Sequence, residues 1–236
     1  MIVECIWEHN GSDSLIYAGN FPGAFTRGPN KEIALAKFER EIRSWTKWRN
    51  EGIDEEISDF AVKMIQEKSS DLQISDADSD VIFDTEREPL SREEYESLKT
   101  LALRSAACFQ ALYDSVPDPN TTDLPERTTF YGKVPRTAKE TYEHTKGVNA
   151  YYFGEIGVEA DNSGSIYECR KRGFVVLERI PDFLNLPVFE GSYGEEWSLR
   201  KVLRRFIWHD RIHAKAMYRS ARRIFGEDSV LNPFYF

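Results

Sequence analysis

Two histidines spaced four residues apart are the residues of this chain best suited to bind a metal ion. His209 and His213 share a segment with helical periodicity, and a spacing of four turns a helix through about 400°. Both rings therefore leave one face of the helix, one turn apart. The same face carries Val202, Phe206 and Ala216, so it is the apolar seam of the helix. We expect the two imidazoles to point into a core.

A third histidine has the same kind of position on another predicted helix. His144 shares a face with Val148 and Tyr152. If both seams face one core, three imidazoles meet there, and burying them without partners is costly. A divalent ion relieves this cost by accepting a lone pair from each ring, and three protein ligands leave a position open for water or substrate. We therefore predict a metal site formed by His144, His209 and His213.

The residue types leave the ion and the chemistry open. Imidazole binds zinc, nickel, copper and iron, and we expect zinc or nickel. Tyr152 and Glu155 lie along the His144 face and are candidates for catalytic acid–base or orienting groups. Core packing of the tyrosine and solvent exposure of the glutamate are the alternatives. Asp210 points about 100° away from its neighbour His209, which favours an ion pair over metal ligation.

The helices that must position these residues are marked by their caps. Ser91 with Glu94, and Thr137 with Glu140, form capping boxes, which satisfy free backbone donors at a helix start. Two further helical patterns follow, and the last ends at Gly226. The predicted helices cover residues 91–116, from 137 onward, 165–180 and 197–225, with a long loop over 118–135. Residues 91–236 are thus predicted to form an antiparallel four-helix bundle.

The first 70 residues have a different pattern. Residues 2–7, 15–17 and 60–67 are predicted strands, and an amphipathic helix is predicted between Asn30 and Gly52. Together they indicate a small α+β domain over residues 1–70. Residues 71–90 are rich in Asp and Ser and lack the interior glycine of an EF-hand calcium loop, so a solvated acidic linker is predicted. The fold class expected for the chain is α+β.

The segments that carry the histidines resemble a known family. Residues 208–213 (WHDRIH), preceded by Trp197-Ser198-Leu199-Arg200, resemble the last conserved stretch of DinB-like (DinB/YfiT) proteins. Tyr142-Glu143-His144-Thr145 resembles the helix that supplies the first metal ligand in that family, and the resemblance covers about residues 90–226. It implies a metal-binding four-helix bundle, and a metal-dependent transferase that uses a low-molecular-weight thiol on a small-molecule substrate. Hydrolysis by a metal-bound hydroxide is an alternative use of the same site.

The N-terminal segment resembles another family. Residues 1–68 are similar to the HicB-like antitoxin domain in the order of their elements and in Phe21-Pro22-Gly23, followed by Gly28, Glu32 and Ala34. The resemblance implies a fold and a surface for a protein partner or a homodimer, but no antitoxin function, because no DNA-binding segment follows. The chain is then alternatively a non-catalytic, stress-related interaction or sensor module.

Composition excludes some classes of partner. The formal net charge of -9 argues against nucleic acid, and the cations between Arg200 and Arg223 are expected on the solvated face of a helix. Three scattered cysteines fit a reducing compartment. The first residues do not match a signal peptide and no run of about 20 apolar residues occurs, so we expect a cytoplasmic protein without a membrane span.

His9 is expected at the surface, and Phe234-Tyr235-Phe236 is expected to pack on the protein, with a role in a dimer as the alternative.

Overall fold

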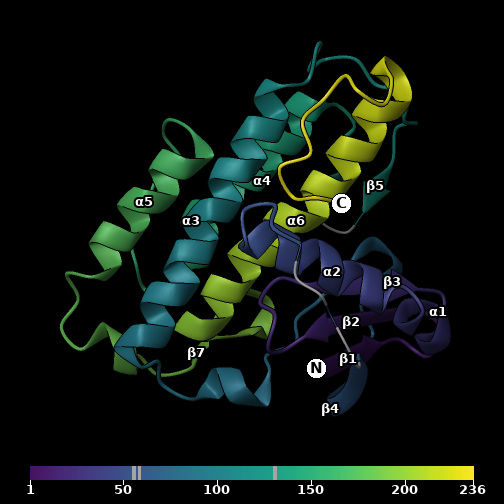
Figure 1. The fold of residues 1–236 in the computed structure, drawn as a ribbon. Coiled ribbons are helices and arrows are strands. Elements are labelled where there is room, and N and C mark those ends of the chain that lie inside the picture. Colours follow the sequence, from purple (N-terminus) through teal and green to yellow (C-terminus); the bar gives the residue numbers. More distant parts are fainter. Residues whose placement is uncertain (55–56, 58–59, 130–131) are drawn as a thin grey trace.

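The chain combines an N-terminal β-sheet with a set of longer C-terminal helices (Figure 1). The computed structural model describes residues 1–54, 57, 60–129 and 132–236. It confirms a mixed α+β fold. Of the predicted long loop over 118–135, residues 130 and 131 lie outside the described residues.

The N-terminal sheet has the strand order β3-β2-β1-β4. Strand β1 pairs antiparallel with β2 and parallel with β4, and β2 pairs antiparallel with β3. Three of these strands were predicted, whereas β3 was missed because its four residues hold a single large apolar side chain. The strands are β1 (Ile2–His9), β2 (Ser14–Ala18), β3 (Phe25–Gly28) and β4 (Ala61–Ser69).

Two helices cover one face of the sheet where a single helix was predicted. The side chain of Asn30 accepts a hydrogen bond from Ile33 N at 2.9 Å, which caps the start of α1 (Lys31–Leu35) as expected. Helix α2 (Phe38–Arg49) follows after a break at residues 36–37. Ile42 and Trp45 on its buried face belong to the same hydrophobic core as residues of the sheet.

The acidic segment over residues 71–90 is packed, and the prediction of a solvated linker is wrong. It contains the 3-10 helices η1 (Ile74–Asp76) and η2 (Asp84–Arg87). Ile74, Val81 and Phe83 are buried in a second core with Tyr17 of β2 and Trp208. These apolar residues lie between the acidic ones. The free energy gained by burying their apolar surface is enough to hold the segment on the protein, although the neighbouring residues are polar.

The long helices start where their caps predicted. Ser91, Thr137 and Ser165 each form a capping box with a glutamate three residues later, and Ser198 caps the last helix. Helix α6 contacts α3 and α4, and α5 contacts the same two helices. The helices are α3 (Arg92–Asp114), α4 (Ala138–Gly154), α5 (Ile166–Leu177) and α6 (Leu199–Phe225).

Short elements fill the connections between these helices. The predicted loop after α3 contains the paired strands β5 (Thr128–Thr129) and β6 (Gly132–Lys133). Between α5 and α6 the chain forms η3 (Phe183–Asn185), β7 (Phe189–Glu190), η4 (Ser192–Gly194) and β8 (Glu196–Trp197). No helix in the described part of the chain is long and apolar enough to cross a membrane.

Helix α6 lies between the other helices and the N-terminal part, so most of its side chains are buried. The prediction that its cations form a solvated face is therefore wrong for Lys201, Arg204, Arg205 and Arg211. Each has a buried or nearly buried carboxylate partner from outside the helix, which offsets the cost of removing the charge from water. The partners are Glu195 for Lys201 and Arg205, Glu86 for Arg204, and Glu41 for Arg211.

Candidate metal centre

Helices α4 and α6 position the three histidines that the sequence singled out. Each helix begins at a side-chain cap, where Thr137 accepts from Glu140 N at 3.0 Å and Ser198 accepts from Lys201 N at 3.1 Å. Helical geometry then places His144 in the second turn of α4, and His209 and His213 one turn apart on α6. Because α4 and α6 pack against each other, rings from both helices meet.

The structure brings the three imidazoles together. The ring centroids of His209 and His213 are 4.3 Å apart, and those of His144 lie 5.2 Å from His209 and 4.7 Å from His213. One ligand atom of each residue lies within 4.8 Å of the other two. The convergence expected from the helical spacing is therefore present.

The spacing of the ring nitrogens fits a shared ion. The Nε2 atoms of His209 and His213 are 3.1 Å apart, and an ion about 2.0–2.1 Å from both would bind them at an angle of roughly 100°. This value lies between the ideal octahedral and tetrahedral angles. A direct hydrogen bond between the two rings also fits 3.1 Å, but it accounts for two rings, whereas an ion accounts for the presence of His144 as well.

Burial keeps the three rings neutral. The His144 residue is largely exposed, but its ring packs against the other two, and this partial desolvation lowers its pKa. Burial, and then the neighbouring His144 ring, lower the pKa of His213 to about 3. The pKa of His209 is lowered well below its usual value, by burial first and then by the neighbouring histidines. A neutral imidazole retains the lone pair that metal binding requires.

Of the two candidate acid–base residues, Tyr152 alone lies beside the histidines. Its ring meets that of His209 edge to face at 5.9 Å, and burial raises the pKa of its hydroxyl. Glu155 lies eleven residues after His144, about 16 Å further along α4. Its carboxylate accepts a hydrogen bond from Ser192 N at 2.7 Å, so it fixes η4 to the end of α4.

Solvent reaches the site from the side of His144. The side chain of His144 is exposed, that of His213 is half-buried and that of His209 is buried. The C-terminal aromatic residues do not cover the site, because Phe234 packs on Trp48 of α2 with ring centroids 5.8 Å apart. This packing confirms the expectation that the C-terminal residues pack on the protein.

The loop after α3 lies next to the site and leaves a small cavity there. Thr121 and Leu124 of this loop line a cavity of about 40 Å³ together with Thr141 of α4 and Ala216 and Ser220 of α6. Thr141 and Ala216 are one helical turn from His144 and His213, respectively. The cavity therefore lies one helical turn from His144 and His213, between α4 and α6.

The remaining polar residues on these helices have structural partners. Asp210 forms a fully buried ion pair with Arg170 of α5, as its orientation on the helix predicted. His9, expected at the surface, is half-buried and donates a hydrogen bond from Nε2 to Oε1 of Glu67 at 3.2 Å. No sequence pattern pointed to Arg27 of β3, whose charge also lowers the pKa of His213. This electrostatic interaction joins positions 186 residues apart, which local periodicity does not reveal.

Comparisons with known proteins do not identify a family for this chain. No family model matches the chain, and no curated protein and no solved structure resembles it at a significant level.

Proposed function

We propose that this protein binds one divalent transition-metal ion through His144, His209 and His213 and presents an open coordination position to a small molecule. The observation that carries the proposal is the convergence of three neutral imidazoles from two helices, with one ligand atom of each within 4.8 Å of the others. Exposure of His144 gives a small molecule a path to the site. Zinc or nickel is the ion that we expect.

The proposal extends to the fold. We take residues 91–236 to be a DinB-like antiparallel four-helix bundle and residues 1–70 to be a HicB-like α+β domain. The order of the helices supports this assignment, as do the contacts of α6 with α3 and α4. The position of the ligands on the seam between α4 and α6 supports it as well, because bundles build metal sites from facing helices.

The chemistry that we propose is transfer of a low-molecular-weight thiol to a small-molecule acceptor. A divalent ion in such a site lowers the pKa of a bound thiol and so supplies a thiolate at neutral pH. Within the described residues, the ligand cluster contains the three histidines and no carboxylate. Thiol activation needs no separate carboxylate base. A cluster of three histidines without a carboxylate therefore suits it better than hydrolysis of an amide or ester. Tyr152 would orient the ring of His209.

The same observation supports a second candidate function. A site with three ligands, one buried tyrosine and no adjacent carboxylate also suits a metal-dependent sensor or interaction module without catalysis. In that case the N-terminal domain would bind a protein partner. Consumption of a thiol by the metal-loaded protein in the presence of an electrophilic acceptor separates the two functions, because a sensor would leave the thiol unchanged.

Elemental analysis of the purified protein tests the metal site. We expect about one transition-metal ion per chain in the wild type, and none in a His209→Ala, His213→Ala double variant. A His9→Gln variant is the matched control, because His9 lies outside the cluster and should leave the metal content unchanged. Equal metal content in wild type and double variant would contradict the proposal, as would no metal in the wild type after zinc and nickel are added back.

A further inference from the structure

The cavity between α4 and α6 continues the seam that carries the three histidines. Its wall on α6 includes Ala216 and Ser220, which are three and seven residues after His213. Its wall on α4 includes Thr141, three residues before His144. Steps of three and seven residues keep side chains on the same side of a helix. The cavity therefore begins one turn from the histidines and reaches to about two turns, or roughly 10 Å.

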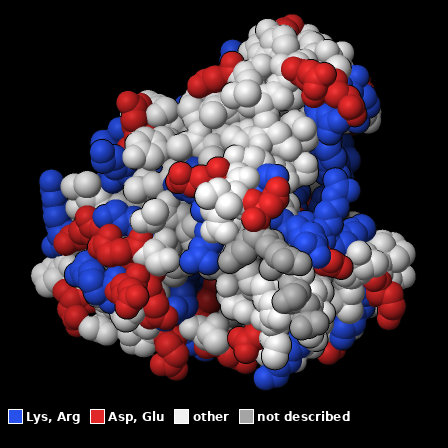
Figure 2. Space-filling view, viewed as in Figure 1, with Lys and Arg blue, Asp and Glu red and all other residues white. Residues whose placement is uncertain are grey.

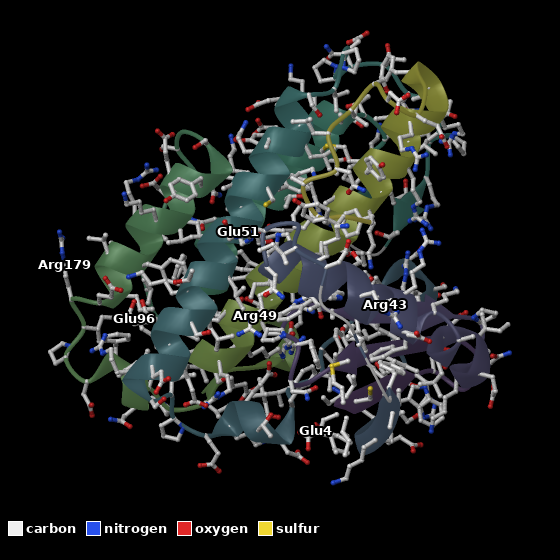
Figure 3. All side chains as sticks on the ribbon, in the orientation of Figure 1. Glu4, Arg43, Arg49, Glu51, Glu96 and Arg179 are labelled. Atoms are coloured by element: carbon white, nitrogen blue, oxygen red, sulfur yellow. The ribbon has the colours of Figure 1, made fainter. Side chains whose placement is uncertain are left out.

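The cavity lies at the end of the molecule where α3 and α6 finish. Val116, two residues after α3, lines it together with Phe225, the last residue of α6. The start of α3, where Figure 3 labels Glu96, is the opposite end of that helix. On the face seen in Figure 2, the surface between the last turns of α3 and α6 of Figure 1 is white. This end of the molecule is therefore poor in charge on the face shown.

The threonine hydroxyls that line the cavity already have partners in the protein. Thr141 Oγ1 donates to Thr137 O at 2.8 Å, and Thr137 Oγ1 accepts from Glu140 N at 3.0 Å. Thr121 Oγ1 donates to Oδ2 of Asp118 at 2.6 Å. Water inside the cavity therefore finds few hydrogen-bond partners on these walls.

Most of the other lining residues are apolar. They include Leu124 from the loop after α3, and Met217 and Ile224 from α6. Arg136 is the charged residue of the described lining, and it is half-buried. An arginine places its alkyl stem against apolar surface and keeps its charge in water. The cavity therefore favours an aliphatic group over water or a polar group.

The size and position of the cavity limit what it holds. Its volume is about 40 Å³, whereas a cavity needs about 10–15 Å³ to hold one water molecule. It therefore has room for about three atoms of that size. His144 and Ala216 are both exposed, so a small molecule reaches the metal ligands and the cavity from the same open side of the seam.

We propose that the cavity binds a short aliphatic group of the small molecule that occupies the open position of the metal ion. This inference rests on the proposed function of the His144, His209 and His213 site, to which it adds the class of ligand. The ligand has its metal-binding atom at one end, a spacer that crosses one helical turn of about 5 Å, and about three carbon atoms beyond it. A ligand without a hydrocarbon end gains nothing from the cavity.

Alkanethiols of different length test the inference on the cobalt-loaded protein. Binding of ethanethiol and of 1-hexanethiol is followed by the sulfur-to-cobalt absorption band, and the ratio of the two dissociation constants measures the contribution of the chain. Each methylene group that is buried strengthens binding about fourfold. With two or three methylene groups in the cavity, the wild type should bind hexanethiol roughly 15- to 60-fold more tightly than ethanethiol.

Two variants that fill the cavity should lose this preference. Ser220→Leu adds a larger side chain two turns from His213, and Ala216→Leu adds one at an exposed position that tolerates it. Each should lower the ratio below about fivefold, because the chain then has less space to fill. The ratio isolates the chain, since an effect on the ion itself changes the binding of both thiols alike. Ala107→Leu is the matched control, because Ala107 is exposed on α3 outside the described lining, and it should keep the full ratio.

Several results would overturn the inference. Equal affinity of the cobalt-loaded wild type for both thiols would remove the inference and leave the metal site intact. A ratio that survives in both filled variants would mean that the chain binds elsewhere, and an equal loss in Ala107→Leu would mean that the cavity is not responsible. Absence of bound cobalt would remove the proposed function and the inference together.

Discussion

Glu41 of α2 accepts a hydrogen bond from Nη2 of Arg211 at 3.0 Å in the interior of the protein. Arg211 lies two residues from both His209 and His213, so it leaves the opposite side of α6. Lys215 also pairs with Glu41; Arg211 is fully buried and Lys215 is half-buried. A carboxylate from the N-terminal part therefore holds the back of the helix that carries two of the proposed ligands.

Replacing Glu41 by glutamine should destabilise the fold by about 3–5 kcal/mol, because removal of one partner leaves buried charge uncompensated. Urea denaturation at pH 7 measures the change. Glu39→Gln is the control, since Glu39 forms an exposed pair with Arg43 and its loss should cost less than about 0.5 kcal/mol. Equal losses in the two variants would show that the Glu41 contacts contribute no more than a surface pair.

The pKa of Glu41 predicts how this contribution changes with pH. Burial raises the pKa of the carboxyl, but Lys215 and Arg211 together outweigh burial and leave it below the usual value of 4.5. A carboxylate with a depressed folded pKa adds stability that is present above the unfolded pKa and is lost as the pH falls through the folded pKa. The stability gap between wild type and Glu41→Gln should therefore be constant above about pH 5 and shrink below pH 4.5.

Glu8 should show the opposite dependence on pH. It is fully buried between β1 and the 71–90 segment, and burial raises the pKa of its carboxyl from 4.5 to about 7. A raised folded pKa gives stability that is complete below pH 4.5 and is lost as the pH rises through 7. Glu8→Gln removes this loss, so it should stabilise the protein by roughly 2–3 kcal/mol at pH 8 relative to pH 5. Denaturation curves that give the same difference at both pH values would contradict this assignment.

Local sequence patterns predicted the helices and the approach of the histidines because both depend on neighbouring residues. The capping boxes at Ser91 and Thr137 fixed two helix starts, and the spacing of His209 and His213 fixed their common face. These features need information from one turn of helix. They can therefore be predicted without knowledge of the tertiary structure.

The missed features depend on contacts between distant residues. Arg204 was expected in solvent, but it pairs with Glu86, which is 118 positions away, and Arg211 pairs with Glu41 over 170 positions. The burial of Val81 and Phe83 likewise requires the sheet and α6. Charge and hydropathy along one segment cannot predict such partners, so the acidic segment and the cations of α6 were both assigned to solvent.

Gly23 should be sensitive to substitution because it lies against Ile207 of α6. It has a φ of +84°, and an added Cβ would lie 2.4 Å from Cγ2 of Ile207. Gly23→Ala should cost about 1–2 kcal/mol for the backbone and about 1–3 kcal/mol more for the clash. Gly11→Ala is the control, since Gly11 has a φ of +93° and no neighbour within 4 Å. Equal losses in thermal unfolding would show that the clash relaxes without cost.

Metal binding should stabilise the folded protein through the ligands on α4 and α6. The three rings come from two helices separated in sequence, so the unfolded chain holds no preformed site, and an ion that binds the native state shifts the equilibrium toward it. At a free zinc concentration 100 times the dissociation constant, the gain should be about 2.7 kcal/mol. Calorimetric scans with zinc and with a chelator measure this difference.

The same scans on substituted proteins identify the atoms responsible. His144→Ala should lower the zinc-induced shift in midpoint strongly, and the His209→Ala, His213→Ala double variant should abolish it, while His9→Gln should keep it. The removal of His144 is the informative case, because the hydrogen bond between His209 and His213 does not need it. If His144→Ala retains the full zinc-induced shift, the ion binds elsewhere, and the 3.1 Å contact between the two rings is an imidazole–imidazole hydrogen bond.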